Sequence, residues 1–499
     1  MAAAVLASVL SGRTEHVALR APGESAMSYG ELAAAVGSLA GRLRTAGVER
    51  GTRVALVAGN GVETIELLLA VVSLGAAAAP LNPSYTPDEH RFFLDDLAPT
   101  ILLLPAGEQD AARRVAPATT RIVDYRLPGD GSVELEAGGA AVHVHTPSEP
   151  ARAEDVALLL HTSGTTSRPK QVPLLHRNLV ASARAIAEHY ELSEHDVSYC
   201  AMPLFHVHGL VASALAALVA GGTVAVPRRL SPARFWDHLS ACGVTWLSAG
   251  PTLHHMLLEK RPAGAATGSL RFVRSCSSAL SPALLARTEA AYGVPMLEAY
   301  GMTEASHQIS SNPLPPAPRL PGSVGLPTGT EIAIVDGRGR RLADGVPGEV
   351  AIRGPGVTPG YLENPEANAA SFFDGWFRTG DQGVVEDGYL RLVGRLKEMV
   401  IRGGENVSPL EVEEVLLDHP AVADAVVFGV PDEKYGEEVA AAVALAAPAE
   451  PEELLRHCRE RLAGFKAPKT VYVLERIPRT PTGKLQRRRM PAHLGIEGP

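Results

Sequence analysis

The sequence predicts an α/β protein with a large N-terminal domain of doubly wound parallel sheets, a small β-rich subdomain within it, and a small α+β C-terminal domain. The first third alternates strand and helix patterns, the segment from Glu331 to Leu392 holds strands with tight turns, and alternation returns after about Glu398. A chain of 499 residues with 46% hydrophobic content is too long for one compact core, so two or more domains are expected.

The first third has the pattern of parallel strands joined by helical crossovers. Apolar residues recur at helical spacing over 29–46, and a short apolar run over 53–58 indicates a buried strand. A second helix is expected over 63–74 and a second strand over 77–81. Strands that alternate with helices in this way favour parallel pairing, because each crossover returns the chain to the same end of the sheet.

Later segments differ in character. After Asp155 the run VALLLH indicates a short buried strand that enters a turn, and residues 210–220 are an apolar segment of small residues that is expected to be helical. Two segments, 126–155 and 311–330, are rich in Gly and Pro and are predicted to be irregular.

Composition argues against several classes of protein. The net charge is −9 and no basic stripe dominates, so nucleic acid is not expected as a partner. The four cysteines lack C-x-x-C spacing, so we expect neither disulfides nor a zinc site. Free cysteines in turn predict a cytoplasmic location. The apolar N-terminus lacks a basic region and is expected to be an amphipathic helix, and no segment is expected to span a membrane.

A hydroxyl-rich loop after the strand at Asp155 is the main candidate for chemistry. Residues 162–170 read TSGTTSRPK, in which hydroxyls and backbone N–H groups can donate to phosphate oxygens and a lysine adds positive charge. The candidate phosphate-binding residues are Thr162, Ser163, Gly164, Thr165, Thr166 and Lys170. The loop is not a Walker motif, and no G-x-G-x-x-G follows this strand, so a dinucleotide-binding fold is not supported.

This loop resembles the signature of the adenylate-forming (ANL) superfamily, which includes acyl-CoA synthetases, luciferases and peptide-synthetase adenylation domains. Further motifs follow in the order of that superfamily: PLFHVHG (203–209), AYGMTE (299–304), GEVAIRGPGVTPGY (348–361), GWFRTGD (375–381), GRLKEMVIRGGENVSPLEVE (394–413) and PRTPTGKLQRR (478–488). Together they cover nearly all of the chain past residue 160. The loop departs from the usual pattern twice, because Ser167 replaces a frequent Gly and Gln171 stands where Gly is usual.

The resemblance implies an AMP-forming acyl-CoA synthetase that uses ATP, Mg²⁺ and coenzyme A (CoA). Such an enzyme joins a carboxylic acid to AMP and then transfers the acyl group to the thiol of CoA. The acid and the phosphate it attacks are both anions, so catalysis must consist of charge neutralisation and in-line positioning. The implied organisation is an N-terminal domain over 1–394, a hinge at 395–397 and a mobile C-terminal lid domain over 398–499.

The resemblance assigns catalytic roles at the phosphates of ATP. Glu304 is expected to hold Mg²⁺, a hard cation that prefers oxygen ligands. Thr303 and Thr165 are expected to donate to phosphate oxygens. Lys484, in the Gly-containing segment TPTGKLQ, is expected to be the adenylation lysine, because its charge offsets the negative charge that grows on the α-phosphate and carboxylate oxygens.

Nucleoside and CoA contacts are assigned in the same way. Tyr300 is expected to stack on adenine beside Gly301, and Asp381 with Arg395 to hold the ribose, because one carboxylate can accept from two vicinal hydroxyls. Lys397 occupies the hinge position. In this family the small domain rotates after adenylate formation, which removes the adenylation lysine. The rotation brings up a CoA-binding segment, here Arg402, Gly403, Gly404 and Glu405.

The acyl pocket is expected between the helix after His206, the strand end near Ser275 and the YGMTE loop. His206 lies where the family often has a gate between the acyl pocket and the thiol tunnel, whereas His208 is expected to be structural. The segments RSCSSAL (274–280) and TEASHQISSNPLP (303–315) are polar for a lipid tunnel. A second substrate carboxylate needs donors or positive charge when it is buried, and these could come from His206, Ser275, Ser277 and His307.

Several of these stretches resemble the oxalate–CoA ligase branch, above all the pattern TEA-x-H-x-x-SSNPLP. The expected substrate is therefore oxalate or another very small diacid. Malonate, a medium- or long-chain fatty acid and an aromatic acid stay open as alternatives, as does a freestanding enzyme that loads a carrier protein in trans. Cys276 is expected to be a packed thiol rather than a nucleophile.

Overall fold

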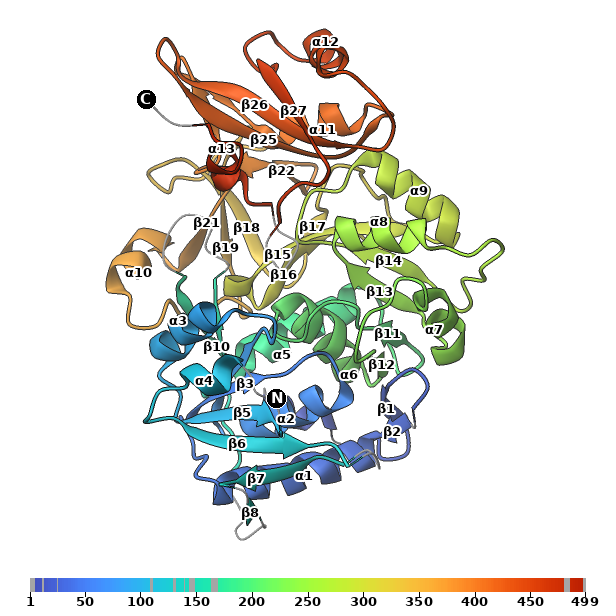
Figure 1. Ribbon diagram of the computed structural model, residues 1–499, viewed down its shortest axis with the longest axis vertical. Helices are drawn as coiled ribbons and strands as arrows, with labels where there is room; N and C mark the ends of the chain where they lie inside the picture. The colour runs from blue at the N-terminus through green and yellow to red at the C-terminus, as the bar shows by residue number, and fades with distance from the viewer. Residues whose placement is uncertain are drawn as a thin grey trace.

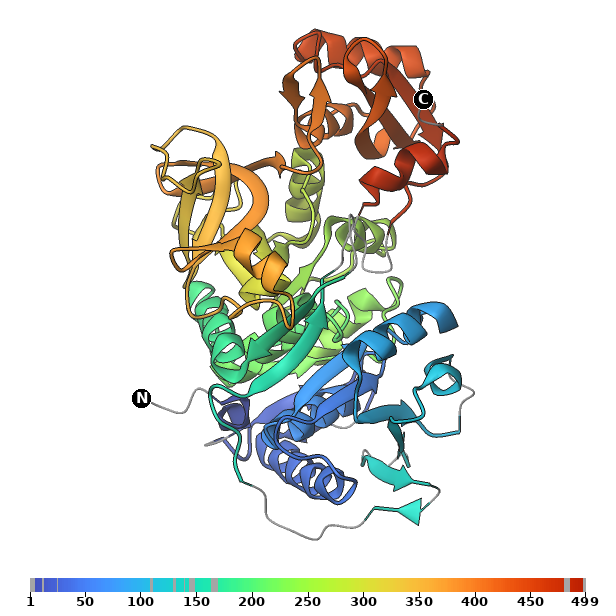
Figure 2. The same ribbon diagram turned by 90° about the vertical axis from the view of Figure 1, so that its left-hand side faces the viewer.

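The computed structural model describes residues 5–10, 13–24, 26–107, 111–128, 132–138, 140–142, 149–162, 169–479 and 485–496. The first large sheet lies at the bottom of Figure 1, the strand-rich region lies beside strands β15–β17 of the second large sheet, and the C-terminal part lies at the top end of the molecule (Figure 1, Figure 2). This architecture confirms the predicted α/β class with parallel sheets and a small C-terminal domain. Among the described residues, no helix is both long and apolar enough to cross a bilayer.

The first large sheet is built by the N-terminal third of the chain. Its order is β10-β9-β4-β3-β5-β6-β7-β8, and the strands from β9 to β6 are parallel, as the alternating pattern predicts. The strands are β3 (Arg53–Val57), β4 (Ala77–Leu81), β5 (Ile101–Pro105), β6 (Arg121–Arg126), β7 (Glu134–Ala137), β8 (Ala140–Ala141), β9 (Val156–His161) and β10 (Gln171–Leu175). The central strands are continuously apolar because both faces of the sheet are buried.

The second large sheet follows the order β17-β16-β15-β14-β13-β11-β12-β1-β2, with parallel pairing from β15 to β1. Its strands are β1 (Val17–Arg20), β2 (Ala26–Ser28), β11 (Val197–Tyr199), β12 (Thr223–Ala225), β13 (Trp246–Ala249), β14 (Phe272–Ser275), β15 (Met296–Met302), β16 (His307–Ser311) and β17 (Leu326–Pro327). The carboxyl ends of its parallel strands lie at one edge, which is where ligands bind in open α/β sheets.

Local sequence signals set the helices. The first long helix starts at a capping box of Ser28 and Glu31, and its buried residues, such as Leu32, Val36 and Leu43, recur at helical spacing. The helices of the N-terminal part are η1 (Leu6–Leu10), α1 (Tyr29–Thr45), α2 (Val62–Ser73), α3 (Pro87–Leu97), α4 (Ala111–Val115), α5 (His176–His189), α7 (Phe235–Cys242), α8 (Pro251–Glu259), α9 (Pro282–Tyr292), η3 (Thr303–Ala305) and α10 (Pro365–Ser371).

The apolar segment 210–220 is helical as predicted, but its first part is a π-helix. This helix, η2 (His208–Leu215), continues into α6 (Ala216–Ala220). Gly209 is required at its start, because a Cβ there would lie 2.3 Å from the carbonyl oxygen of Pro203. The π-helix therefore packs directly against the preceding loop, and such turns are frequent at functional sites.

Two smaller sheets complete the fold. The strand-rich region holds β18 (Glu331–Val335), β19 (Gly348–Arg353), β20 (Phe372–Phe373), β21 (Trp376–Glu386) and β22 (Tyr389–Arg395). The C-terminal sheet holds β23 (Val400–Arg402), β24 (Glu405–Val407), β25 (Val422–Asp432), β26 (Gly436–Leu445) and β27 (Thr470–Leu474). The C-terminal helices are α11 (Pro409–Leu417), α12 (Pro451–Arg461), η4 (Arg487–Arg489) and α13 (Met490–His493). Val412 and Leu454 pack on one face of this sheet, and Met490 packs on the other.

The helix predicted at the N-terminus is a short 3-10 helix, Leu6–Leu10. Two predictions about local structure need correction. The segment 126–155 is not wholly irregular, because β7 pairs with β6 and buries Leu135. The loop 311–330 contains the short strand β17, which pairs with β16.

The C-terminal part contacts the rest of the chain around β22 and α11. Ser408 caps α11, and its hydroxyl donates to the carbonyl oxygen of Val393 at the end of the strand-rich region. Nearby, Glu298 on β15 is 7% exposed and accepts the Gly322 N–H at 3.1 Å. Burial is the main reason that the pKa of Glu298 rises to about 7, and the charge of Glu414 on α11 adds to the rise.

Replacing Glu298 with Gln is expected to remove a pH dependence of stability. In the folded chain Glu298 keeps its proton up to a pKa of about 7, whereas in the unfolded chain it loses the proton near its ordinary pKa of 4.5. The free energy of unfolding of the parent therefore falls as the pH rises through this window, by up to about 3 kcal/mol from this group. Urea unfolding across the window tests this: a Glu298→Gln variant with the slope of the parent would contradict it.

Candidate active site

An antiparallel strand pair carries the hydroxyl-rich loop, with β9 leading into it and β10 leading out. The Thr162 N–H donates to the carbonyl oxygen of Lys170 at 2.9 Å, and the Lys170 N–H donates to the Thr162 hydroxyl at 3.0 Å. These two bonds close the base of the loop. The predicted phosphate contacts between them, Ser163, Gly164, Thr165 and Thr166, lie outside the described residues.

Lys170 lies near the candidate magnesium ligand Glu304, with an aromatic ring between them. The Lys170 Nζ lies 4.4 Å from the centroid of the Tyr361 ring, and the Tyr361 hydroxyl donates to Oε1 of Glu304 at 2.9 Å. Burial lowers the pKa of Lys170, the charge of Lys397 lowers it further, and Glu304 acts in the opposite direction. The predicted hinge lysine, the loop lysine and the carboxylate are therefore within electrostatic reach of one another.

The surroundings of Glu304 suit Mg²⁺. Its carboxylate is buried, and η3 presents it beside Thr303 while the Thr358 N–H holds its carbonyl oxygen at 2.8 Å. Across the described ranges no cluster of three or more His, Cys, Asp or Glu side chains could hold a metal ion. One carboxylate combined with phosphate and water oxygens is a usual ligand set for Mg²⁺, and this set fits the site.

The predicted nucleoside residues also come together. Asp381 on β21 and Arg395 on β22 are partners across the strand pair, and the Arg395 Nε lies 3.1 Å from Oδ1 of Asp381. The Tyr300 hydroxyl donates to the other oxygen of Asp381, and burial raises the pKa of that tyrosine well above its ordinary value. Gly301 is required because a Cβ on it would lie 2.1 Å from the carbonyl oxygen of His307.

A fully buried arginine lies at the centre of the candidate acyl pocket. Arg274 on β14 has no solvent exposure, and its guanidinium donates to Tyr190 Oη at 2.9 Å, Ser248 Oγ at 2.6 Å and Gln308 Oε1 at 2.9 Å. All of these acceptors are neutral. Within the described part of the chain no carboxylate forms an ion pair with Arg274, so its positive charge is buried without a protein counter-charge, which is costly.

His208, which is expected to be structural, is hydrogen-bonded beside this cluster. Its Nδ1 lies 2.9 Å from Ser277 Oγ and its Nε2 lies 2.7 Å from Ser248 Oγ. Burial lowers the pKa of His208 well below its ordinary value, and the charge of Arg274 lowers it further, so the ring is neutral at pH 7. The His307 ring lies 5.1 Å from the His208 ring, and the His307 Nδ1 lies 3.4 Å from Nη2 of Arg274.

The remaining predicted pocket residues lie next to this cluster. The Ser275 hydroxyl is buried and has no hydrogen-bond partner in the described residues, and the His206 ring packs beside Phe205 at 5.2 Å. Sequence reasoning missed Arg274 itself, although an arginine inside the apolar run RFVRSC is an available signal, since a buried charge needs a reason. It also missed Tyr361, which sits in the quoted motif GVTPGY but has no charge of its own to mark it.

The predicted CoA-binding segment forms a tight turn between β23 and β24. Gly403 and Gly404 both have positive φ values, 59° and 89°, which only Gly adopts at low cost, and Arg402 is paired with Glu405 across the turn. Arg402 is also held in place by Glu438 and by the Tyr435 ring, whose centroid lies 4.1 Å from Cζ of the arginine. The segment thus presents exposed backbone on a rigid base.

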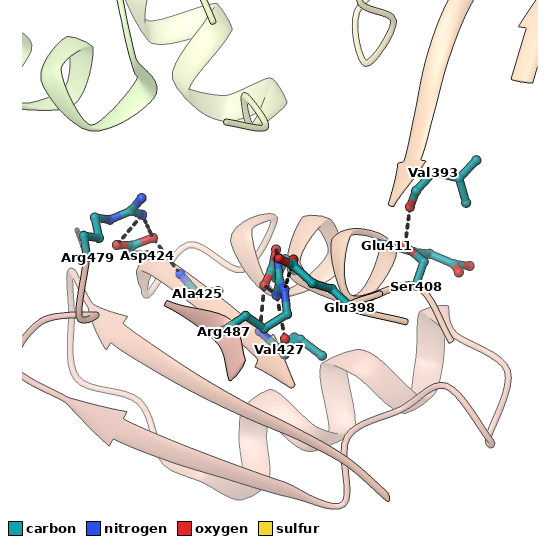
Figure 3. A network of polar contacts seen from close by, with 10 residues as sticks. Val393, Glu398, Ser408, Glu411, Asp424, Ala425, Val427, Arg479 and Arg487 are labelled. Atoms are coloured by element: carbon teal, nitrogen blue, oxygen red, sulfur yellow. Dashed lines mark hydrogen bonds and ion pairs between the residues drawn. The ribbon is translucent and has the colours of Figure 1, made fainter. Parts of the chain in front are cut away.

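Lys484 lies outside the described residues, but both of its flanks are anchored to the C-terminal sheet (Figure 3). Before it, Arg479 pairs with both oxygens of Asp424 at 2.8 Å. After it, the buried Arg487 pairs with Glu413 on α11 and with Glu398, next to the predicted hinge, at 3.0 Å. The described residues on either side of the predicted adenylation lysine are therefore tied to β25, to α11 and to Glu398 next to the predicted hinge.

The base of the hydroxyl-rich loop at Lys170 thus lies near Glu304, and Asp381 pairs with Arg395, two groupings that bring together segments far apart in the sequence. The chain belongs to the AMP-binding enzyme family, whose sequence model matches residues 7–362, and the model of the AMP-binding enzyme C-terminal domain matches residues 411–484.

Similar proteins include several CoA ligases. The chain is 46% identical to a probable CoA ligase of Humulus lupulus, covering 95% of this chain and 93% of that one. It is 44% identical to an oxalate–CoA ligase of Arabidopsis thaliana, covering 97% and 98% of the two chains, and 42% identical to one of Saccharomyces cerevisiae, covering 88% and 86%.

Solved structures lead to the same class. The ATP-bound structure of MatB from Rhodopseudomonas palustris matches with a TM-score of 0.89 at 31% identity, covering 99% of this chain and 100% of that chain. An O-succinylbenzoate CoA synthetase of Bacillus subtilis with ATP and magnesium matches with a TM-score of 0.83 at 32% identity, covering 95% and 96%. The chain is therefore an AMP-forming CoA ligase that uses a carboxylic acid, ATP, Mg²⁺ and CoA.

Replacing Arg487 with Met is expected to destabilise the chain by about 3–5 kcal/mol, because Glu413 would be left buried without its partner. Urea unfolding of the full chain measures the loss, and the exposed Arg489→Met is the matched control, expected within about 0.5 kcal/mol of the parent. Adding Glu413→Gln to Arg487→Met should recover part of the loss. An unchanged urea midpoint for Arg487→Met would contradict the ion pair.

Proposed function

We propose that this CoA ligase acts on oxalate or another very small dicarboxylic acid. The observation that supports this substrate is the buried guanidinium of Arg274, which has neutral hydrogen-bond partners and no protein carboxylate among the described residues. A second carboxylate on the substrate supplies the missing counter-charge, while the first carboxylate reacts. A monocarboxylic acid would leave the arginine uncompensated.

Ser277, which is hydrogen-bonded to His208 of this cluster, also lines a small cleft. A cleft of about 150 Å³ lies beside Ser277, with Met202 and Leu253 in its walls. Sites for larger ligands usually span roughly 300–1,000 Å³. The polar groups around Arg274, namely His208, Ser277 and His307, would orient the second carboxylate, since each can take part in a hydrogen bond.

In the proposed first step, a carboxylate oxygen of the acid attacks the α-phosphate of ATP and pyrophosphate leaves. Lys170, Lys484 and the hydroxyls of 162–166 and Thr303 hold phosphate oxygens. Glu304 holds Mg²⁺, which neutralises phosphate charge when bound. Asp381 and Arg395 hold the ribose, and Tyr300 with Gly301 contacts adenine. Positioning and charge neutralisation account for the catalysis, because repulsion between the two anions is the main barrier to their approach.

In the proposed second step, the C-terminal domain (398–499) turns about the hinge 395–397 relative to the N-terminal domain (1–394). Lys397 changes its surroundings, Lys484 leaves, and the segment Arg402–Glu405 approaches with CoA. The thiolate then attacks the acyl carbon near His206, and AMP leaves.

All four cysteines are buried and free, which supports a reducing, cytoplasmic compartment.

The substrate proposal predicts a large difference between oxalate and glyoxylate, which has the same carbon skeleton but an aldehyde in place of one carboxylate. Removing one partner of a buried charge pair typically costs about 2–5 kcal/mol, so kcat/KM for glyoxylate should be at least about 30-fold lower. Formation of the CoA thioester and pyrophosphate release, over a panel that includes malonate, fatty and aromatic acids, measures this. Equal rates with the two acids would refute the proposal.

Replacing Arg274 with Met should abolish the preference for oxalate. The variant removes a buried charge that lacks a protein counter-charge, but it also removes three hydrogen bonds, to Tyr190, Ser248 and Gln308, so a loss of about 1–3 kcal/mol of ligand-free stability is expected. Steady-state kinetics with oxalate and glyoxylate test the expected change in preference. Urea unfolding without ligands tests the expected change in stability. A variant that keeps the oxalate preference, or that unfolds far more easily than the parent, would assign Arg274 a structural role instead.

Replacing Lys484 with Ala should slow formation of the acyl-adenylate by about 10²–10³-fold, the usual loss when one group that stabilises developing charge is removed. Transfer of a preformed acyl-adenylate to CoA should stay close to the parent rate, because the lysine has left by then. Exchange of labelled pyrophosphate into ATP measures the first step, with Lys469→Ala as a control at an exposed lysine of the same domain. Undiminished exchange would sink the assignment.

A further inference from the structure

The two strands that flank the hydroxyl-rich loop (162–170, here called the phosphate loop) are held together by one carboxylate from a helix distant in the sequence. The strands β9 and β10 are called the arms of the loop. His161 ends β9 and Gln171 begins β10, and the two residues are partners across the strand pair. Oδ2 of Asp96, on α3, lies 2.9 Å from Nε2 of His161 and accepts from Nε2 of Gln171 at 2.8 Å. The carbonyl oxygen of Asp96 also accepts from Gln171 at 2.6 Å.

The surroundings of this contact make it firm. The side chains of His161 and Asp96 are only 7% and 14% exposed, and hydrogen bonds to an ionised acceptor are stronger when water is excluded. The Phe93 ring, one turn earlier on α3, meets the His161 ring edge-on at 4.8 Å between centroids. Helix α3 therefore holds both arms of the loop through a polar bond and a ring contact.

The loop base fixed in this way sets the position of two phosphate-site residues. Thr162 and Lys170 directly follow and precede the clamped pair, and they are bonded to each other. The Lys170 Nζ is in turn placed over the Tyr361 ring, whose hydroxyl contacts Glu304. A shift of either arm would move the lysine relative to the carboxylate, and small misplacements of this kind are costly in catalysis.

Gln171 supplies one half of the contact with Asp96. Gly is usual at this position in the corresponding loop of the adenylate-forming superfamily, and it has no side chain that could reach Asp96. The departure noted in the sequence thus adds two hydrogen bonds at the exit of the loop.

We propose that Asp96 is a positioning residue for acyl-adenylate formation, which fixes the base of the phosphate loop so that Thr162 and Lys170 are in place for the β- and γ-phosphates of ATP. This inference rests on the proposed role of the loop in holding phosphate oxygens of ATP, which it narrows to the two outer phosphates. Asp96 acts through His161 and Gln171 and does not itself contact the nucleotide.

The test compares the binding of Mg·ATP with that of AMP, which lacks the two outer phosphates. Asp96→Ala is expected to raise the Kd of Mg·ATP about tenfold, from the loss of hydrogen bonds to a charged acceptor, and to leave the Kd of AMP within about twofold. Titration calorimetry measures both constants. Asp95→Ala, at the exposed neighbouring position on α3, is the matched control and is expected to change neither.

Further variants separate the possible outcomes. Gln171→Gly should weaken Mg·ATP in the same direction but less, and the double variant should be no weaker than Asp96→Ala alone. If Asp96→Ala does not fold, Asp96→Asn, which keeps the shape and one acceptor oxygen, should give an intermediate loss for Mg·ATP only. Equal losses for ATP and AMP, or additive effects of the two substitutions, would overturn the proposal.

Lys170→Ala distinguishes failure of this inference from failure of the proposed function. If Lys170→Ala weakens Mg·ATP while Asp96→Ala does not, the loop holds phosphates but Asp96 does not position it. If neither variant changes the Kd of Mg·ATP, the assignment of the loop to the outer phosphates is itself wrong.

Discussion

A positive charge buried without a protein counter-charge is the constraint on which the acyl pocket depends. Tyr190, Ser248 and Gln308 satisfy the N–H groups of Arg274, but they are neutral and leave its charge uncompensated. Taking such a charge out of water costs several kcal/mol. In the proposed account, a small dianion offsets this free-energy cost when it binds next to the guanidinium. An acid without the second carboxylate does not offset the cost, and the enzyme is therefore selective for diacids.

The phosphate side of the site arranges its positive charge differently. Lys170 directly precedes β10 of the first sheet. Lys484 belongs to the C-terminal part, and the residues that flank it, Arg479 and Arg487, are anchored in that part. In the proposed cycle the two lysines meet only during adenylation. Such a division lets positive charge be present when two anions are joined and absent when the thiolate arrives, which a single rigid domain could not achieve.

Much of the fold could be predicted from the sequence, because short-range hydrophobic patterns determine many of its strands and helices. The alternation over 53–81 gave β3, α2 and β4 nearly residue by residue, and the order of motifs led to Glu304, Asp381 and Arg395. What could not be predicted depends on contacts between distant segments. The role of Arg274 becomes visible only when the residue after α5 and strands β13 and β16 bring Tyr190, Ser248 and Gln308 around it.

Other unpredicted features have the same origin. Nothing in PLFHVHG shows that a π-helix will turn His208 toward Ser277. The role of Gln171 depends on Asp96, which lies 75 residues away in the chain. A short-range pattern can mark a residue as unusual, but the physical reason appears only with the tertiary contacts.

The most direct measurement is a crystal structure of the enzyme with oxalate, Mg²⁺ and a non-hydrolysable ATP analogue. The account predicts that one carboxylate of oxalate accepts hydrogen bonds from the Arg274 guanidinium, while the other points at the α-phosphate in line with the bond to the leaving pyrophosphate. A structure in which oxalate binds elsewhere, with the guanidinium still bonded to Tyr190, Ser248 and Gln308 and to no ligand, would contradict it.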